Sequence, residues 1–113
     1  LNRNGLKKPP DGKTRSAPTP VLAFLSEGRK KLPLGEHPVR IGKAPTSDIF
    51  VNGFLVGKTA AVINRLEDGW YLSCVGGLAR VKINGQVVKA AVKLNLLDVI
   101  TLGKLKMQFL QVA

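Results

Sequence analysis

The sequence predicts an all-β protein in which antiparallel strands form a sandwich without substantial helix. Polar and apolar residues alternate along many short runs, which is the pattern of half-buried strands. Turn signals that contain glycine separate these runs at short intervals, as they do in sandwiches and barrels. No stretch has apolar residues at the 3.6-residue spacing of a helix bounded by capping residues.

The N-terminal segment has a different composition from the rest of the chain. Residues 1–20 contain four prolines, two glycines and five basic side chains, with almost no apolar residues. Such a segment buries too little apolar surface to offset the entropy lost on ordering. We therefore expect a flexible, basic, proline-rich tail or linker over 1–20 and one domain over 21–113.

The predicted strands follow one another from residue 21 to the C-terminal region. Their runs are apolar or alternate with period two, at 21–25, 31–34, 38–41, 49–51, 60–66, 70–74, 79–83, 86–88, 99–102 and 104–109. Asp68-Gly69 and Asn84-Gly85 each stand between two such runs, which predicts two tight hairpins because glycine tolerates positive φ.

The apolar positions of these runs predict a core between two sheets. We expect it to contain Leu22, Phe24, Val39, Ile41, Ile49, Val62, Leu72, Val81, Ile83, Ile100, Leu102, Met107 and Phe109. Trp70, which follows a tight turn, is expected to be an amphipathic packing residue.

The composition excludes several classes of protein and site. With one cysteine and one histidine the chain holds neither an internal disulfide nor a zinc site, and Cys74 is expected to pack in the core. Lysines interrupt the apolar C-terminal third, so no membrane span is predicted. The chain lacks a signal-peptide pattern and does not begin with Met, which indicates a cytoplasmic setting and a fragment of a larger chain.

Catalytic patterns are missing from the sequence. The single histidine, His37, has no serine or cysteine partner that spacing would identify, and the seven carboxylates show no paired motif. We therefore expect a protein that is not an enzyme, with no catalytic residues, cofactor, metal or small-molecule substrate.

The net charge of +11 has two interpretations. The first is solubility, with lysines on solvent-facing strand positions. The second is an anionic partner, either a phosphorylated or acidic peptide, a nucleic acid or an acidic lipid. Nucleic acid ranks last, because aromatic residues make up only 5% of the chain and no recognition helix is predicted.

Several motifs occur in a specific order between residues 39 and 109. They are Val39-Arg-Ile-Gly-Lys43, Ser47-Asp-Ile49, Gly57-Lys-Thr-Ala-Ala-Val-Ile63, Trp70, Val81-Lys-Ile-Asn-Gly85, and Asp98-Val-Ile-Thr-Leu-Gly103. This order resembles the forkhead-associated (FHA) domain, a β-sandwich of the SMAD/FHA type that recognises phosphothreonine peptides. The resemblance implies an FHA-like sandwich over 21–113 with its binding loops gathered at one end.

The resemblance places an anion-binding site at Lys43, Gly57, Lys58 and Arg80. Lys43 stands where the family has its phosphate-binding arginine, and it keeps the charge without the planar fork of a guanidinium. Gly57 stands where the family has a serine, and Lys58 where an arginine follows it. The motif is therefore degenerate.

Two supporting residues of the family motif are also replaced. Ala60 stands at the histidine that braces the loop, and Ala79 at the asparagine that holds the peptide backbone. The resemblance implies a protein-interaction module in a signalling or regulatory assembly. Its partner is a phosphothreonine or acidic peptide, bound weakly or not at all.

The alternative is a phospho-independent assembly domain, as in secretion-type ring components. The segment from Val51 to Val56, with Phe54 and Leu55, is then either an exposed apolar contact patch or part of the core.

Overall fold

A computed structural model describes residues 19–26, 28–53 and 55–112 of the 113-residue chain. These residues contain strands and no helix, and the strands form two sheets. The strands are β1 (Thr19–Phe24), β2 (Leu32–Pro33), β3 (Val39–Gly42), β4 (Ile49–Phe50), β5 (Ala61–Leu66), β6 (Gly69–Cys74), β7 (Lys82–Ile83), β8 (Gln86–Val87), β9 (Val92–Lys93), β10 (Val99–Leu102) and β11 (Leu105–Val112).

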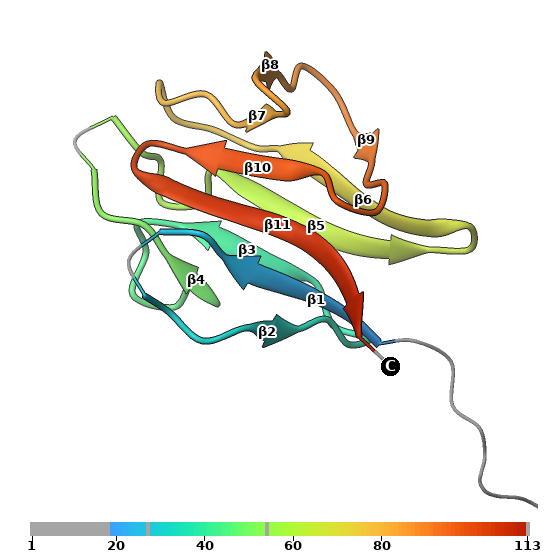
Figure 1. Cartoon of the computed structure of the whole chain (residues 1–113). Coiled ribbons are helices and arrows are strands. Elements are labelled where there is room, and N and C mark those ends of the chain that lie inside the picture. The colour runs from blue at the N-terminus through green and yellow to red at the C-terminus, as the bar shows by residue number, and fades with distance from the viewer. Residues whose placement is uncertain (1–18, 27, 54, 113) are drawn as a thin grey trace, which may run out of the picture.

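The two sheets pack face to face (Figure 1). One has six strands in the order β2-β1-β11-β10-β7-β8, and the other has five in the order β4-β3-β5-β6-β9. The predicted sandwich is confirmed, with one difference. Strands β3 and β4 pair in parallel, with Ile41 opposite Ile49, whereas the other strand pairs are antiparallel.

Both predicted hairpins form, but the first turns at Glu67 and Asp68, one residue before the predicted Asp68-Gly69. Strands β5 and β6 pair from Ala61↔Cys74 to Leu66↔Gly69, and Gly69 has φ of 146°. Strands β7 and β8 flank Asn84 and Gly85, whose φ values are 52° and 85°. Asn84 and Gly85 are the two central residues of this turn, and a tight hairpin turn of this type requires positive φ at both.

The core lies between the sheets and contains ten of the thirteen predicted residues. Phe24 and Ile83 are partly buried and pack against it, as do Trp70 and Cys74. Val62 was predicted in the core, but it is only half-buried, and its neighbours Ala61 and Ile63 are fully buried instead. Side chains alternate across a strand, so the error is one residue of register.

The predicted tail over 1–20 falls mostly on residues 1–18, outside the described residues. Strand β1 begins at Thr19, two residues before the predicted start of the domain, and pairs along its whole length with β11. In the part of the chain that the structure describes, no helix is long and apolar enough to span a bilayer.

Candidate functional site

Three connections between strands meet at the end of the sandwich that lies away from the C-terminus (Figure 1). They are the β3–β4 connection (43–48), the described parts of the β4–β5 connection (51–53 and 55–60) and the β6–β7 connection (75–81). We call these residues the loop rim. All four residues of the predicted anion-binding site belong to it.

Backbone contacts join the first connection to the second. The amide of Lys43 donates a hydrogen bond to the carbonyl of Gly57 at 3.0 Å, and the amide of Ala44 donates to the carbonyl of Lys58 at 3.0 Å. Gly42 makes this approach possible, because a Cβ there would overlap the Lys58 carbonyl oxygen. The Ser47 hydroxyl adds a side-chain hydrogen bond to the same Lys58 carbonyl at 3.4 Å, so backbone and side-chain contacts both hold the two connections together.

Backbone contacts also join the second connection to the third. A Cβ at Gly57 would lie 3.0 Å from the carbonyl atoms of Gly76 and from the Gly77 nitrogen. Gly77 has φ of 91°, and a Cβ there would overlap the Gly57 amide nitrogen. Beside this contact the amides of Leu78 and Ala79 both donate to the carbonyl of Leu55 at 2.9 Å. The Gly57 amide nitrogen therefore lies against protein backbone.

The structure brings Lys43, Gly57 and Lys58 together through their backbones, and Gly57 contacts Gly77 of the connection that carries Arg80. Lys43 is half-buried, whereas Lys58 and Arg80 are exposed. Arg80 lines a cavity with Gly76 and Gly77 that neither lysine lines. Within the described residues, none of these three cationic side chains makes a hydrogen bond or an ion pair.

The two alanines that replace family motif residues are part of the scaffold. Ala60 is fully buried, its amide donates to the carbonyl of Ile41 at 2.7 Å, and its carbonyl accepts from Val75 at 2.8 Å. Ala79 is half-buried and packs against the core. Neither position has a polar side chain that reaches a ligand at the rim.

Apolar side chains are exposed on the loop rim. The exposed fractions of Leu55, Val75 and Leu78 are 48%, 57% and 75%. The hydrogen bond from the Leu78 amide to the Leu55 carbonyl holds the backbones of these two residues side by side. Of the two alternatives left open for residues 51–56, Val51 and Val56 belong to the core and Leu55 is exposed, whereas Phe54 lies outside the described residues.

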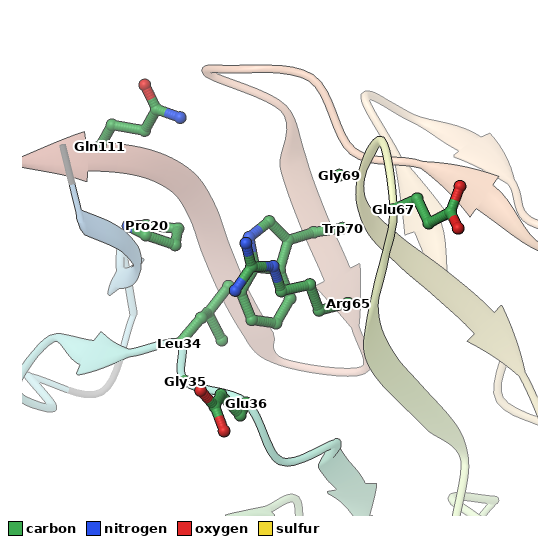
Figure 2. A pocket seen from close by; sticks show the side chains of 9 residues that line it. All are labelled: Pro20, Leu34, Gly35, Glu36, Arg65, Glu67, Gly69, Trp70 and Gln111. Carbon is green, nitrogen blue, oxygen red and sulfur yellow. The ribbon is translucent and has the colours of Figure 1, made fainter. Parts of the chain in front are cut away.

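A cavity of about 420 Å³ lies at the other end of the sandwich (Figure 2). Its lining combines Trp70 and Leu34 with charged side chains of both signs, namely Arg65, Glu36 and Glu67. Arg65 and Trp70 are directly opposite on β5 and β6. The predicted packing role of Trp70 is confirmed, since it contacts the core. The mixed charges of this cavity select no single class of ligand.

One acidic side chain near this end has a perturbed pKa. The Tyr71 hydroxyl donates a hydrogen bond to Asp68 Oδ2 at 2.9 Å, and Lys93 Nζ lies 3.6 Å from the same oxygen. The hydrogen bond from Tyr71 is the largest cause that lowers the pKa of Asp68, and Lys93 lowers it further. The same hydrogen bond raises the pKa of Tyr71. Asp68 and Lys93 are exposed and Tyr71 is half-buried, and Tyr71 and Lys93 are opposite each other on β6 and β9.

The resemblance did not indicate Lys89, which lines the cavity beside Arg80. A signal for it was present in the sequence. The Asn84-Gly85 turn sets the hairpin register, and Arg80 and Lys89 stand at equal distances from it along the chain, four residues out on each side. The exposed Leu55 and Leu78 had no comparable signal, because neighbouring apolar residues of the same segment are buried.

Solved FHA structures have the same fold at low sequence identity. Mycobacterium tuberculosis EmbR, in complex with a low-affinity phosphopeptide, matches with a TM-score of 0.76 and 24% identity over 84% of this chain and 25% of that one. The FHA domain of the CT664 protein from Chlamydia trachomatis matches with 0.73 and 18% over 84% and 99%. The FHA domain of an Arabidopsis thaliana hypothetical protein matches with 0.74 and 19% over 90% and 96%. This chain thus spans a quarter of EmbR and nearly all of the other two.

No curated protein sequence matches the chain. Residues 25–113 match the family described as the inner membrane component of T3SS, cytoplasmic domain, in which T3SS is the type III secretion system. This match covers most of the chain and agrees with the fold of the solved FHA structures. The chain therefore belongs to the family of cytoplasmic domains of type III secretion inner membrane components and is an FHA domain.

Proposed function

We propose that this FHA domain is a protein-interaction module, rather than an enzyme, which holds a partner protein at its loop rim without requiring phosphothreonine. The observation that carries the proposal is the exposure of Leu55 and Leu78 on that rim. Apolar side chains that cluster on a rigid surface are typical of protein contact sites. The family description supports a role in an assembly, with the domain on the cytoplasmic side of the inner membrane.

The packing at Gly57 argues against a phosphate-reading role. The family has a serine there, but this position has no hydroxyl, and its amide nitrogen lies against Gly77. Ala60 and Ala79 supply no side-chain donor. Neutral donors contribute to phosphate recognition together with cations, so their loss leaves the ammonium groups of the lysines, which lack the planar fork of a guanidinium group.

Site-specific photo-cross-linking tests the proposal in cells that produce the full-length protein. A photoreactive residue in place of Leu78 should give a discrete cross-linked protein, and treating the lysate with phosphatase before irradiation should not remove it. Leu66 is a matched control, because its side chain is 52% exposed at the far end of β5. Equal products at the two positions, or loss of the Leu78 product after phosphatase, would contradict the proposal.

A second candidate function is weak recognition of acidic or phosphothreonine peptides. Lys43, Lys58 and Arg80 favour it, because in the described part of the chain they have no side-chain partners. EmbR, which has the same fold, was solved with a low-affinity phosphopeptide. Titration with matched phosphorylated and unphosphorylated peptides tests this candidate, and equal affinity for both would exclude phosphate-specific recognition.

A further inference from the structure

A cavity of about 340 Å³ opens beside the loop rim and has an unusual charge distribution. It is lined by Cys74, Val75, Gly76, Gly77, Arg80, Val88 and Lys89. Two of these side chains are cationic, and no carboxylate stands among the described residues of the lining. The cavity therefore concentrates positive charge at a concave place next to exposed apolar side chains.

The hairpin register explains why the two cations meet. Strands β7 and β8 pair Lys82 with Val87, and the amide of Val88 donates to the carbonyl of Val81 at 2.9 Å, which continues the register. Beyond these pairs, Arg80 precedes Val81 and Lys89 follows Val88, and both side chains line the cavity. Two like charges that line one small cavity repel each other.

The repulsion between Arg80 and Lys89 is not relieved within the described residues. Neither side chain has a hydrogen bond or ion pair there, and both are exposed. Lys93 provides the contrast, because its ammonium group lies 3.6 Å from the Asp68 carboxylate. An anion from outside the domain would relieve the repulsion and gain charge-assisted hydrogen bonds from both cations.

We propose that Arg80 and Lys89 form an anion pocket, which binds the carboxylate of an aspartate or glutamate in the protein segment that docks on the loop rim. This inference rests on the function proposed above and names the chemistry of the partner. Val75 is 57% exposed and lines the same cavity, and Leu78 lies three residues further along. The segment that fits has an acidic residue beside a large apolar one.

A carboxylate fits this pocket better than a phosphate group does. The lining has two cations but no serine, threonine, asparagine or glutamine side chain among the described residues. A phosphate presents three strong acceptor oxygens and carries up to two negative charges, whereas the two oxygens of a carboxylate can be bound by a guanidinium and an ammonium group without neutral side-chain donors. The pocket is concave and adjoins apolar side chains, which favours a peptide over the flat surface of an anionic membrane.

Peptide selection followed by binding measurements tests the inference. A displayed library of random peptides is panned against the 113-residue chain, the R80Q/K89Q variant and the charge-matched K30Q/K31Q variant, whose changes lie at exposed lysines outside the cavity. We expect the chain and K30Q/K31Q to enrich peptides with an acidic residue beside a large apolar one. The selected peptide should bind R80Q/K89Q at least about tenfold more weakly, the effect of losing one charge-assisted hydrogen bond.

A double-mutant cycle identifies the paired groups. Changing the acidic residue of the selected peptide to its amide should weaken binding to the chain but should have little further effect on R80Q/K89Q. The melting temperature of R80Q/K89Q should not fall, because the variant removes a repulsion. This second readout separates a lost pocket from a lost fold.

Other outcomes would overturn the inference in distinguishable ways. Enriched peptides without acidic residues, with equal binding to R80Q/K89Q, would refute the anion pocket but leave the rim function standing. A selected peptide insensitive to L55S and L78S but dependent on Arg80 would refute the rim function instead.

Much tighter binding after phosphothreonine replaces the acidic residue would refute the preference for carboxylate. Charge-dependent binding to phosphatidylserine vesicles without any peptide enrichment would assign the pocket to a membrane.

Discussion

The backbones of Gly57 and Gly77 lie in direct contact, so that a Cβ on Gly77 would overlap the amide nitrogen of Gly57. The backbone of each glycine thus occupies the space that a side chain on the other would need. The contact joins the β4–β5 connection to the β6–β7 connection, and it leaves little room for a side chain at residue 57.

Restoring the serine of the family motif should damage the fold rather than restore phosphate binding. In Gly57→Ser the new Cβ meets the Gly76 and Gly77 backbone at 3.0 Å, which is overpacking against atoms that cannot rotate away. We expect a loss of about 1–3 kcal/mol in the free energy of unfolding, measured by urea denaturation.

Gly35→Ser is the matched control, because a Cβ there has no heavy atom within 4 Å and the residue has no positive φ. Its effect should stay within about 0.5 kcal/mol. If the two serine variants are equally stable, the contact between the connections is looser than the structure indicates.

The register of β5 predicts a large difference between two adjacent residues. Ile63 is fully buried opposite Leu72, whereas Val62 is half-buried on the other face of the strand. Ile63→Ala should lower the free energy of unfolding by about 2–5 kcal/mol, because it leaves a cavity in the core. Val62→Ala should cost less than about 1 kcal/mol, and a larger cost for Val62→Ala than for Ile63→Ala would show that the strand has the register expected from the sequence.

Asp98 should be a stability residue, because its buried carboxylate accepts two hydrogen bonds. Asn84 Nδ2 donates to Oδ1 at 2.9 Å, and the Asn95 amide donates to Oδ2 at 2.8 Å. Asp98 is only 8% exposed, so water does not easily replace it. Asp98→Ala should cost about 2–4 kcal/mol in thermal or chemical unfolding, since two donors lose their acceptor.

Asp48→Ala is the control for Asp98. Asp48 also accepts a backbone hydrogen bond, from the Arg40 amide at 2.9 Å, but its side chain is exposed and water can take its place. We expect a cost below about 1 kcal/mol. Equal losses in the two variants would mean that burial does not govern the contribution of these carboxylates.

The Tyr71 hydroxyl should control the titration of Asp68. Its hydrogen bond lowers the pKa of Asp68 in the folded protein, so the carboxylate contributes stability above its ordinary pKa, and that contribution is lost as the pH falls through the folded pKa. Tyr71→Phe should raise the pKa of Asp68 towards its ordinary value and remove this part of the acid dependence. Carboxyl carbon shifts followed by NMR report the change.

Lys93→Gln separates the two partners of Asp68. Lys93 is a smaller cause of the lowered pKa than Tyr71, so its removal should raise the pKa by less. The reverse order of effects would show that the ion pair dominates over the hydrogen bond.

Local features of the sequence were sufficient to predict the fold class and the hairpins. Alternation along a strand depends on which side chains face water, and the Asn84-Gly85 turn depends on two residues that accept positive φ. Strands of two residues were harder, as at β9 (Val92–Lys93), because so short a run has no periodicity of its own. The register of β5 was ambiguous because apolar residues fill its first three positions, Ala61 to Ile63.

By itself the sequence determined an all-β sandwich, its tight turns and the excess of basic residues, because each depends on neighbours within a few positions. Only the tertiary structure decided which rim residues are exposed, since Leu55 faces solvent while Val56 beside it enters the core. It also decided that Gly57 meets Gly77 and that Arg80 shares a cavity with Lys89 rather than with Lys43. Contacts between segments distant along the chain follow from how the sheets pack, and no local pattern encodes that packing.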